Sequence, residues 1–385
     1  MADKPATIAA AVLICIIGGF PLFTLPIIGP VLQEQLGFTI QQAGQVAPIE
    51  VLGVGLASIL AMFWIRRVNW RVAALIAVTA VVIGNILTTF QSDPTALTVI
   101  RFITGFIGEG TVFALGFAIM SDTKETDRNF GFVVAAQVAF GVITMLTLIR
   151  LSAMLGSIGG IYIPLAAVAA LSLIMLRFIP EGGAKEAQAA QEVQATSIAA
   201  PLVALLVLLI WCMGLGAIWA YVGAIGVAGG LEPTSTGDAL AVSSAIAILG
   251  ALAASAMADR FGRLAPVTIA LVVQMVMISL LTGDMSFLRF AATAAIFQIF
   301  WNLTGPYIMA TIASSDASGR AAVVIPAAQT GGFFLGPYIA AQLVTEESLF
   351  PANVLGIAGC LIALVIFVPL VMRINRVTAP ATRVP

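Results

Sequence analysis

The chain contains no histidine and very few charged residues. Lys, Arg, Asp and Glu make up only 9% of its 385 residues, while hydrophobic residues make up 61%. Soluble domains carry roughly 25% charged residues, so a chain this apolar could not cover its own surface in water. Most of it must therefore face lipid. Without histidine, the chain also lacks the commonest general base and metal ligand.

Cysteine and net charge are equally scarce. Cys15, Cys212 and Cys360 each lie within an apolar run and have no metal-ligand spacing. The formal net charge is −1, so no overall field favours nucleic acid. No glycine-rich phosphate loop with an adjoining lysine is present, so the sequence shows no nucleotide site. Any ATP-driven process would therefore need a partner protein. We therefore expect no enzyme activity, no cofactor, no metal and no nucleic-acid partner.

Long apolar runs dominate what is present. Since about 20 apolar residues span a bilayer as a helix, the pattern predicts an all-α membrane protein with twelve transmembrane helices. The predicted helices are 7–32, 42–64, 72–91, 95–120, 130–150, 157–178, 198–224, 236–257, 264–283, 287–313, 320–344 and 351–373.

The basic residues predict the orientation of these helices. Lysine and arginine collect in cytoplasmic loops. With the N-terminus in the cytoplasm, most of the 17 basic residues fall inside, and the even helix count returns the C-terminus to the same side. The cytoplasmic set is Lys4, Arg66, Arg67, Arg71, Lys124, Arg128, Arg177, Lys185, Arg260, Arg263, Arg320, Arg373, Arg376 and Arg383.

The two halves of the chain resemble each other. Arg101 and Arg289 each open a helix and precede a phenylalanine, and Gln137 and Gln329 each follow a pair of alanines. These matches occur in order, which indicates a duplicated six-helix unit, a known transporter architecture with its site between the halves. The expected units are a first bundle, a cytoplasmic linker and a second bundle, at 1–179, 180–197 and 198–385.

One loop carries a family resemblance. Asp259-Arg260, followed by Gly262 and Arg263, resembles the loop between the second and third helices of a half in the major facilitator superfamily. Asp259 at a helix end can pair with arginines on a neighbouring helix end and latch the cytoplasmic side. The first-half copy keeps Arg66 and Arg67 but lacks the aspartate. These five charged residues are the predicted cytoplasmic gate.

A second motif supports the same resemblance. Arg101 followed by Gly105, Gly108 and Gly110 is similar to the fourth-helix motif of that superfamily, and glycines permit close helix packing. The resemblance implies two pseudo-symmetric six-helix bundles that rock around a central site. The family holds many substrates, so it implies a mechanism rather than a cargo.

Three charged residues stand out within the predicted helices, because a charge in hydrocarbon costs about 2.5–3.5 kcal/mol. Glu109 is near the middle of its helix, and Arg101 lies about 800° of rotation earlier, within about 80° of the same face. Glu50 lies at a depth similar to that of Arg101. Burial disfavours a charged carboxylate, so Glu109 can take and release a proton as water access alternates. We expect all three to serve proton coupling; the alternative is a purely structural ion pair.

Aromatic and amide side chains within the helices are the candidates for binding a cargo. Because a buried amide needs partners, a cavity is a favourable place for glutamine and asparagine. Few charges accompany them, which favours a hydrophobic or weakly polar cargo. The candidates are Phe23, Trp219, Tyr221, Gln298, Trp301, Asn302, Gln137 and Gln329.

The sequence thus predicts a proton-coupled secondary transporter of a small organic molecule. An efflux permease for hydrophobic or toxic compounds is the alternative within this class, and a non-transporting membrane sensor is the alternative outside it. The expected partners are the cargo, protons and the lipid bilayer. We expect a monomer in a bacterial inner membrane.

Overall fold

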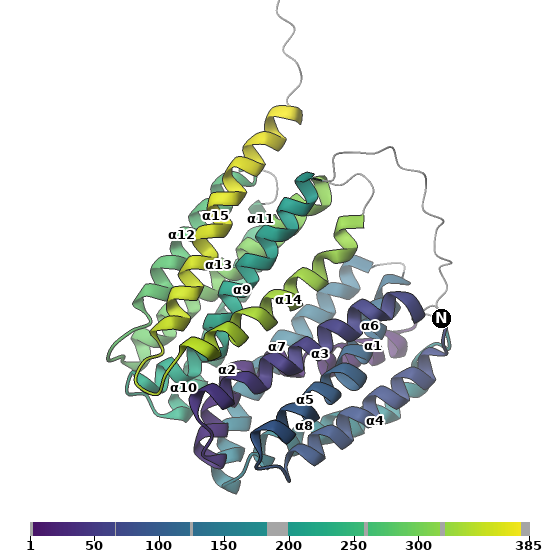
Figure 1. Ribbon diagram of the computed structural model, residues 1–385. Coiled ribbons are helices and arrows are strands. Elements are labelled where there is room, and N and C mark those ends of the chain that lie inside the picture. The colour runs from purple at the N-terminus through teal and green to yellow at the C-terminus, as the bar shows by residue number, and fades with distance from the viewer. Residues whose placement is uncertain are drawn as a thin grey trace, which may run out of the picture.

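The computed structural model describes residues 3–65, 67–123, 126–182, 199–257, 261–315 and 320–378. These residues form a bundle of long helices (Figure 1). Within the described ranges there is no strand, and the only extended pairing is an isolated bridge between Thr345 and Ser348. Most of the predicted linker, 183–197, lies outside these ranges.

The helices before residue 182 follow the predicted apolar runs. Several runs are divided by a local change of helix geometry. The elements are α1 (Pro5–Gly18), α2 (Phe20–Leu36), α3 (Ile40–Trp64), α4 (Trp70–Thr88), α5 (Pro94–Ile103), the π-helix η1 (Thr104–Glu109), α6 (Gly110–Ser121), α7 (Thr126–Leu155), α8 (Gly159–Ser172) and the 3-10 helix η2 (Leu173–Phe178).

The helices after residue 198 do the same. They are α9 (Ala199–Ala228), α10 (Pro233–Ile246), α11 (Ile248–Met257), α12 (Leu264–Leu280), α13 (Phe287–Ser315), α14 (Arg320–Leu343) and α15 (Phe350–Thr378). Each predicted span is thus helical. Among the described residues, nine helical stretches are long and apolar enough to cross a membrane; α12 is apolar but shorter, and α13 and α14 are not in this set. An integral membrane protein is confirmed, and the count of twelve crossings stays a prediction.

Polar caps mark where several helices begin. Thr39 accepts a hydrogen bond from the Gln42 backbone at 3.2 Å, and the Gln42 side chain accepts one from the Thr39 backbone at 3.0 Å. The Asp93 side chain caps α5 through the Ala96 N–H at 2.8 Å. These side chains satisfy N–H groups that have no partner within their helix. The caps therefore set the helix starts more sharply than hydropathy does.

Two long apolar runs are interrupted. Gly19 separates α1 from α2, and Ala247 separates α10 from α11. The Gln137 side chain of α7 donates to the Cys15 carbonyl beside the first interruption at 3.0 Å, and Asn302 of α13 donates to the Ala247 carbonyl at 3.0 Å. A neighbouring helix thus supplies a partner at each interruption, as backbone irregularities inside a bilayer require.

Among the described residues, three helix pairs make the largest contacts between the part of the chain before residue 182 and the part after 198. These are α3 with α14, α7 with α10, and α2 with α9. The remaining large contacts lie within each part, such as α4 with α8 and α12 with α15. The α2–α3 turn and the α14–α15 connection lie at one end of the bundle, and the end of α15 lies at the other (Figure 1).

Candidate functional site

The three charged residues predicted within the helices meet in one buried cluster. Glu50 lies on α3, Arg101 on α5, and Glu109 is the last residue of η1. Their side chains are 3%, 1% and 0% exposed. Arg101 Nη2 donates to Oε1 of Glu50 and, at 3.3 Å, to Oε1 of Glu109. One guanidinium thus bridges two carboxylates.

Neutral side chains surround the remaining faces of Arg101. Its Nη1 donates to Asn85 Oδ1 at 2.9 Å and to Thr88 Oγ1 at 3.4 Å, both on α4. The Tyr162 ring of α8 lies 4.7 Å from the guanidinium carbon, close enough for a cation–π contact. These three residues were not predicted, although Asn85 and Tyr162 are polar residues within apolar runs and carry that signal in the sequence.

The cluster holds more negative than positive charge when both carboxylates are ionised. A buried charge without a counter-charge is costly, so binding one proton brings the cluster to neutrality. Glu50 makes the closer contact with Arg101. Within the described part of the chain, Oε2 of Glu109 has no hydrogen-bond partner. Glu109 is therefore the better place for that proton.

The π-helix places the side chain of Glu109 on the same face of its helix as the side chain of Arg101. In a regular α-helix the two residues, eight positions apart, would lie about 80° out of line. The wider turn of η1 accommodates one extra residue, which removes about 100° and aligns the side chains within about 20°. Sequence periodicity predicted an ordinary helix here, since π turns arise from tertiary packing.

Glycines let α3 approach this π-helix. A Cβ added at Gly105 would collide with the backbone carbonyl of Glu50, and one added at Gly110 would lie 2.7 Å from the Val54 carbonyl. On the α3 side of the same contact, a Cβ added at Gly53 would lie 2.6 Å from the Phe102 carbonyl. The fourth-helix glycines therefore bring the backbone of Glu50 against η1.

Replacing Gly105 with alanine should destabilise the protein. The new methyl group must push α3 away from η1, and overpacking of this kind costs about 1–3 kcal/mol. Gly29 of α2 is the matched control, because nothing lies within 4 Å of a Cβ added there; its change to alanine should be neutral or slightly stabilising. Thermal unfolding in detergent measures both. Equal midpoints for the two variants would contradict the packing argument.

The predicted aromatic residues gather on the helices after residue 198. Trp301 of α13 packs edge-on against Trp219 of α9, with ring centroids 5.5 Å apart, and stacks on Phe333 of α14 at 5.6 Å. Trp219 also donates to the Leu22 carbonyl of α2 at 3.3 Å. Trp219 thus reaches the first part of the chain across the α2–α9 contact, and Trp301 packs behind it.

Phe23 and Tyr221 lie on either side of the same contact. Phe23 of α2 packs against Phe140 of α7, with ring centroids 5.7 Å apart. Tyr221 of α9 is buried, and its hydroxyl has no partner among the described residues. It lines a narrow slit between α2, α3 and α9 that includes Ala43 and Ala47. The hydroxyl lies against Gly44 of α3, where an added Cβ would collide with it.

The predicted amides are placed more diversely. Gln298 of α13 donates to Ser243 Oγ at 2.7 Å and accepts from Ser244 Oγ at 2.9 Å, both on α10. Asn302 and Gln137 bind the backbone at the two helix interruptions described above, and Gln329 is half-buried on α14. Protein groups therefore already bind three of the four amides, and their role toward a cargo stays a prediction.

A neutral polar centre in the later helices was not predicted. Gln274 of α12 is fully buried. Its Oε1 accepts from Trp211 Nε1 at 3.1 Å, and its Nε2 donates to Thr304 Oγ1 at 3.0 Å. This centre lies among α9, α12 and α13, whereas the charged cluster lies among α3, α4, α5, η1 and α8.

Comparison with known proteins decides the family. The model of the Major Facilitator Superfamily matches residues 8–232, more than half of the chain. The chain belongs to the major facilitator superfamily. It is therefore a transporter rather than an enzyme. A comparison with curated protein sequences gives no match.

Solved structures of this superfamily have the same fold. The nucleoside transporter NupG superposes with a TM-score of 0.72 at 14% identity, over 97% of this chain and 100% of that one. A D-xylose–proton symporter superposes with a TM-score of 0.72 at 12% identity, over 93% of this chain and 96% of that one. A structure titled for substrate recognition in proton-dependent oligopeptide transporters gives 0.69 at 13%, over 96% and 100%. At such identities the likeness concerns the fold alone.

The predicted cytoplasmic gate of the transporter falls largely on residues that are not described. Arg66, Asp259 and Arg260 lie outside the described ranges. Arg67 is exposed in the turn between α3 and α4, and Arg263 is half-buried just before α12. The gate therefore stays a prediction.

At the end of the bundle opposite the predicted cytoplasmic gate, three contacts join the two parts of the chain. No sequence motif predicted them. Glu346, in the α14–α15 connection, accepts from the Ile40 N–H at the start of α3 at 2.7 Å. Gln41 donates to the Val344 carbonyl at 2.7 Å. Arg150 of α7 pairs with Asp238 of α10 at 2.6 Å. These contacts, here called the end latch, join the two parts of the chain.

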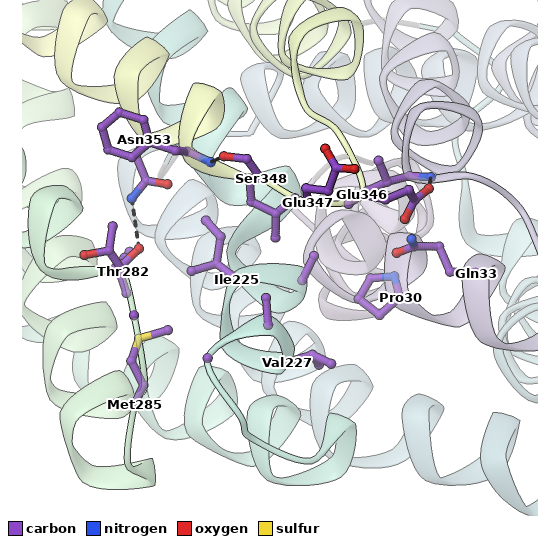
Figure 2. Close-up of a pocket in the computed structure, with 18 of the residues that line it drawn as sticks. Pro30, Gln33, Ile225, Val227, Thr282, Met285, Glu346, Glu347, Ser348 and Asn353 are labelled. Carbon is purple, nitrogen blue, oxygen red and sulfur yellow. Dashed lines mark hydrogen bonds between the residues drawn. The ribbon is translucent and has the colours of Figure 1, made fainter.

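A cavity of about 730 Å³ lies beside the end latch. Figure 2 shows Glu346, Glu347 and Ser348 of the α14–α15 connection across from Pro30 and Gln33 of α2. Glu34 also lines it. The cavity therefore has a carboxylate-rich rim and lies next to the slit that contains Tyr221.

Removing the carboxylate of Glu346 should loosen the end latch. Glu346 is exposed, and an exposed charged contact contributes at most about 1 kcal/mol, so Glu346→Ala should raise the open population up to about fivefold. A cysteine placed at buried Ala47, in the slit, reports opening through its reaction rate with a membrane-impermeant thiol reagent. The three native cysteines are buried and give little background. Glu347→Ala is the control; an equal rise there would contradict the role of Glu346.

Proposed function

We propose that this chain is a proton-coupled secondary transporter of a small organic molecule. It would work by alternating access between two six-helix halves, 1–179 and 198–385, joined by the linker 180–197. The observation that carries the proposal is the buried cluster of two carboxylates and one guanidinium. A charge imbalance that one proton corrects, in a bilayer-embedded helix bundle, is a built-in proton site.

The cluster has the surroundings that such a site needs. Glu109 lies on the π-helix, a geometry often found at functional sites, and one of its oxygens is free to carry a proton. Loss of that proton leaves the cluster negative, so the deprotonated form favours a conformation that admits water. Proton binding then biases the equilibrium between two conformations, which is what coupling requires.

We propose that the cargo binds between the halves, against Trp219, Trp301 and Tyr221. The aromatic surface favours an apolar or weakly polar molecule, and the Tyr221 hydroxyl supplies a hydrogen-bond partner. Such a surface also suits the export of hydrophobic compounds, so the direction of transport is the open choice within this proposal.

We propose that the protein lies in a bacterial inner membrane with both termini in the cytoplasm. The end latch then faces away from the cytoplasm and is closed here. The monomer is the proposed unit.

Flux measurements in proteoliposomes test the proposal. The vesicles contain an internal pH dye and an imposed proton gradient, and they receive a panel of labelled nucleosides, sugars and aromatic compounds. Cargo movement accompanied by proton movement supports the proposal. Cargo that moves in the same direction as the protons indicates symport and import, and cargo that moves against them indicates antiport and export. Cargo flux that ignores the proton gradient would remove the coupling. No flux with any compound, together with binding of one, would favour a membrane sensor.

A further inference from the structure

A groove of about 500 Å³ lies on the side of the molecule, away from the contacts between the two parts of the chain. It is bounded by the last turns of α3, the first turns of α4, and the segment from η1 into α6. Its lining is almost entirely apolar: Ala57, Leu60, Phe63, Trp64, Ala73, Ile76, Ala77, Phe106, Ile107 and Thr111.

The rim of the groove belongs to the lipid-facing surface. Phe63 is 66% exposed and Ile76 is 59% exposed, and Leu60 and Ile107 are exposed as well. Leu60, Ile76 and Ile107 lie on helical stretches that are long and apolar enough to cross a membrane, and Phe63 follows two residues after the end of the first of these stretches. In a bilayer, the space between such side chains is filled by hydrocarbon.

The basic residue Arg67 follows three positions after Trp64, which lines the groove. Arg67 is exposed and follows Trp64 in the α3–α4 turn, with its backbone N–H bound to the Trp64 carbonyl at 2.8 Å. Trp70 holds the turn in place, since its ring N–H donates to the Ile65 carbonyl at 2.6 Å. Arg71 is engaged elsewhere, with Glu181 at 3.3 Å.

The dimensions match one leaflet. From Trp64 to Ala57 helix α3 descends about 10 Å at the helical rise, so the groove runs from the α3–α4 turn into one leaflet of the roughly 30 Å hydrocarbon core. A lipid with its phosphate at Arg67 would therefore place its acyl chain along the whole groove. We infer that this groove binds an anionic phospholipid of the surrounding bilayer, with the acyl chain against Trp64 and the phosphate at Arg67.

The floor of the groove gives the lipid a consequence. Phe106 and Ile107 belong to η1, and Ala57 lies 2.6 Å from a Cβ added at Gly110. Ala77 supplies a carbonyl 3.1 Å from a Cβ added at Gly108. The acyl chain thus lies on the outer side of the π-helix whose inner side presents Glu109.

Quenching of Trp64 by brominated acyl chains tests the site. The full-length protein is reconstituted with phosphatidylglycerol or phosphatidylcholine that carries bromine on the acyl chain. The emission of Trp64 is obtained by subtracting the fluorescence of Trp64→Phe from that of the wild type. Trp70, Trp211 and Trp219 are buried, so bromine on a lipid should quench them little. We expect the anionic lipid to quench this emission at about fivefold lower mole fraction, the preference that one arginine near an anionic surface gives.

Two variants and their controls separate the headgroup from the chain. Arg67→Gln should abolish the preference for the anionic lipid, while Lys4→Gln, which removes a basic charge outside the groove, should keep it. Ala73→Phe should fill the groove and reduce quenching by both lipids, while Ala167→Phe, at an exposed position on α8, should not.

Two results would overturn the inference. Equal quenching by the two lipids, unchanged in Arg67→Gln, would mean ordinary boundary lipid without a site. Weak quenching of Trp64 by either lipid would mean that another occupant, such as an apolar cargo or a second copy of the chain, covers the groove.

Discussion

Replacing Glu109 with glutamine should abolish proton-driven accumulation of the cargo while leaving cargo exchange across the membrane close to the wild-type rate. Glutamine has the shape of glutamate and can still accept the hydrogen bond that Arg101 now donates at 3.3 Å. It cannot take up or release a proton, so the cluster keeps one charge state throughout the cycle. Coupling is lost, but the conformational change and the cargo site remain.

The measurement compares two fluxes in the same vesicles. Gradient-driven accumulation should fall to the level without a gradient, and counterflow of labelled cargo against unlabelled cargo should persist. Glu34→Gln makes the same chemical change at an exposed carboxylate beside the end-latch cavity and should leave both fluxes intact. If Glu109→Gln retained full gradient-driven accumulation, Glu109 would be a structural residue and the proposed coupling site would be wrong.

Replacing Arg101 with methionine should cause the largest loss of stability in the protein. The variant leaves Glu50 and Glu109 buried without their counter-charge, and removing one partner of a buried ion pair typically costs about 3–5 kcal/mol. It also leaves Asn85 and Thr88 without the donor they now share. Chemical unfolding in mixed micelles measures the free energy.

Arg289→Met is the matched control for this loss. Arg289 is the predicted counterpart of Arg101 in the second half, but it is exposed, and its side chain donates to the backbone carbonyls of Leu280, Thr282 and Asp284. Its replacement should change stability much less. The double variant Arg101→Met with Glu50→Gln should recover part of the loss, because it buries one carboxylate fewer. Equal losses at Arg101 and Arg289, or no recovery in the double variant, would show that the buried charges do not determine the effect.

The helices and the buried charges could be predicted because hydrocarbon imposes simple rules. A span needs a long apolar run, which the sequence displays directly, and a charge inside such a run stands out against its neighbours. Glu50, Arg101 and Glu109 were identified in this way, and the structure brings them together. Their function is still a prediction.

Features that depend on tertiary packing could not be predicted. Gly105 and Gly110 allow α3 to press against the π-helix, and the spacing of residues along the chain does not contain this contact. Glu346 is one of several carboxylates in exposed connections, so nothing in its local sequence indicates that it binds the start of α3. In the sequence Gln274 resembles the other amides, and its partners appear only when α9 and α13 are packed against α12.

The buried ion cluster and the aromatic surface lie in different stretches of the chain. Glu50, Arg101 and Glu109 are all encoded before residue 110, while Trp219, Trp301 and Phe333 are all encoded after residue 218. If the first set supplies the energy and the second chooses the cargo, the two traits can be inherited separately. Mutations after the linker can then alter which cargo is carried without changing the proton coupling. Exchanging the second half with that of a relative would change the cargo preference and leave the coupling site intact.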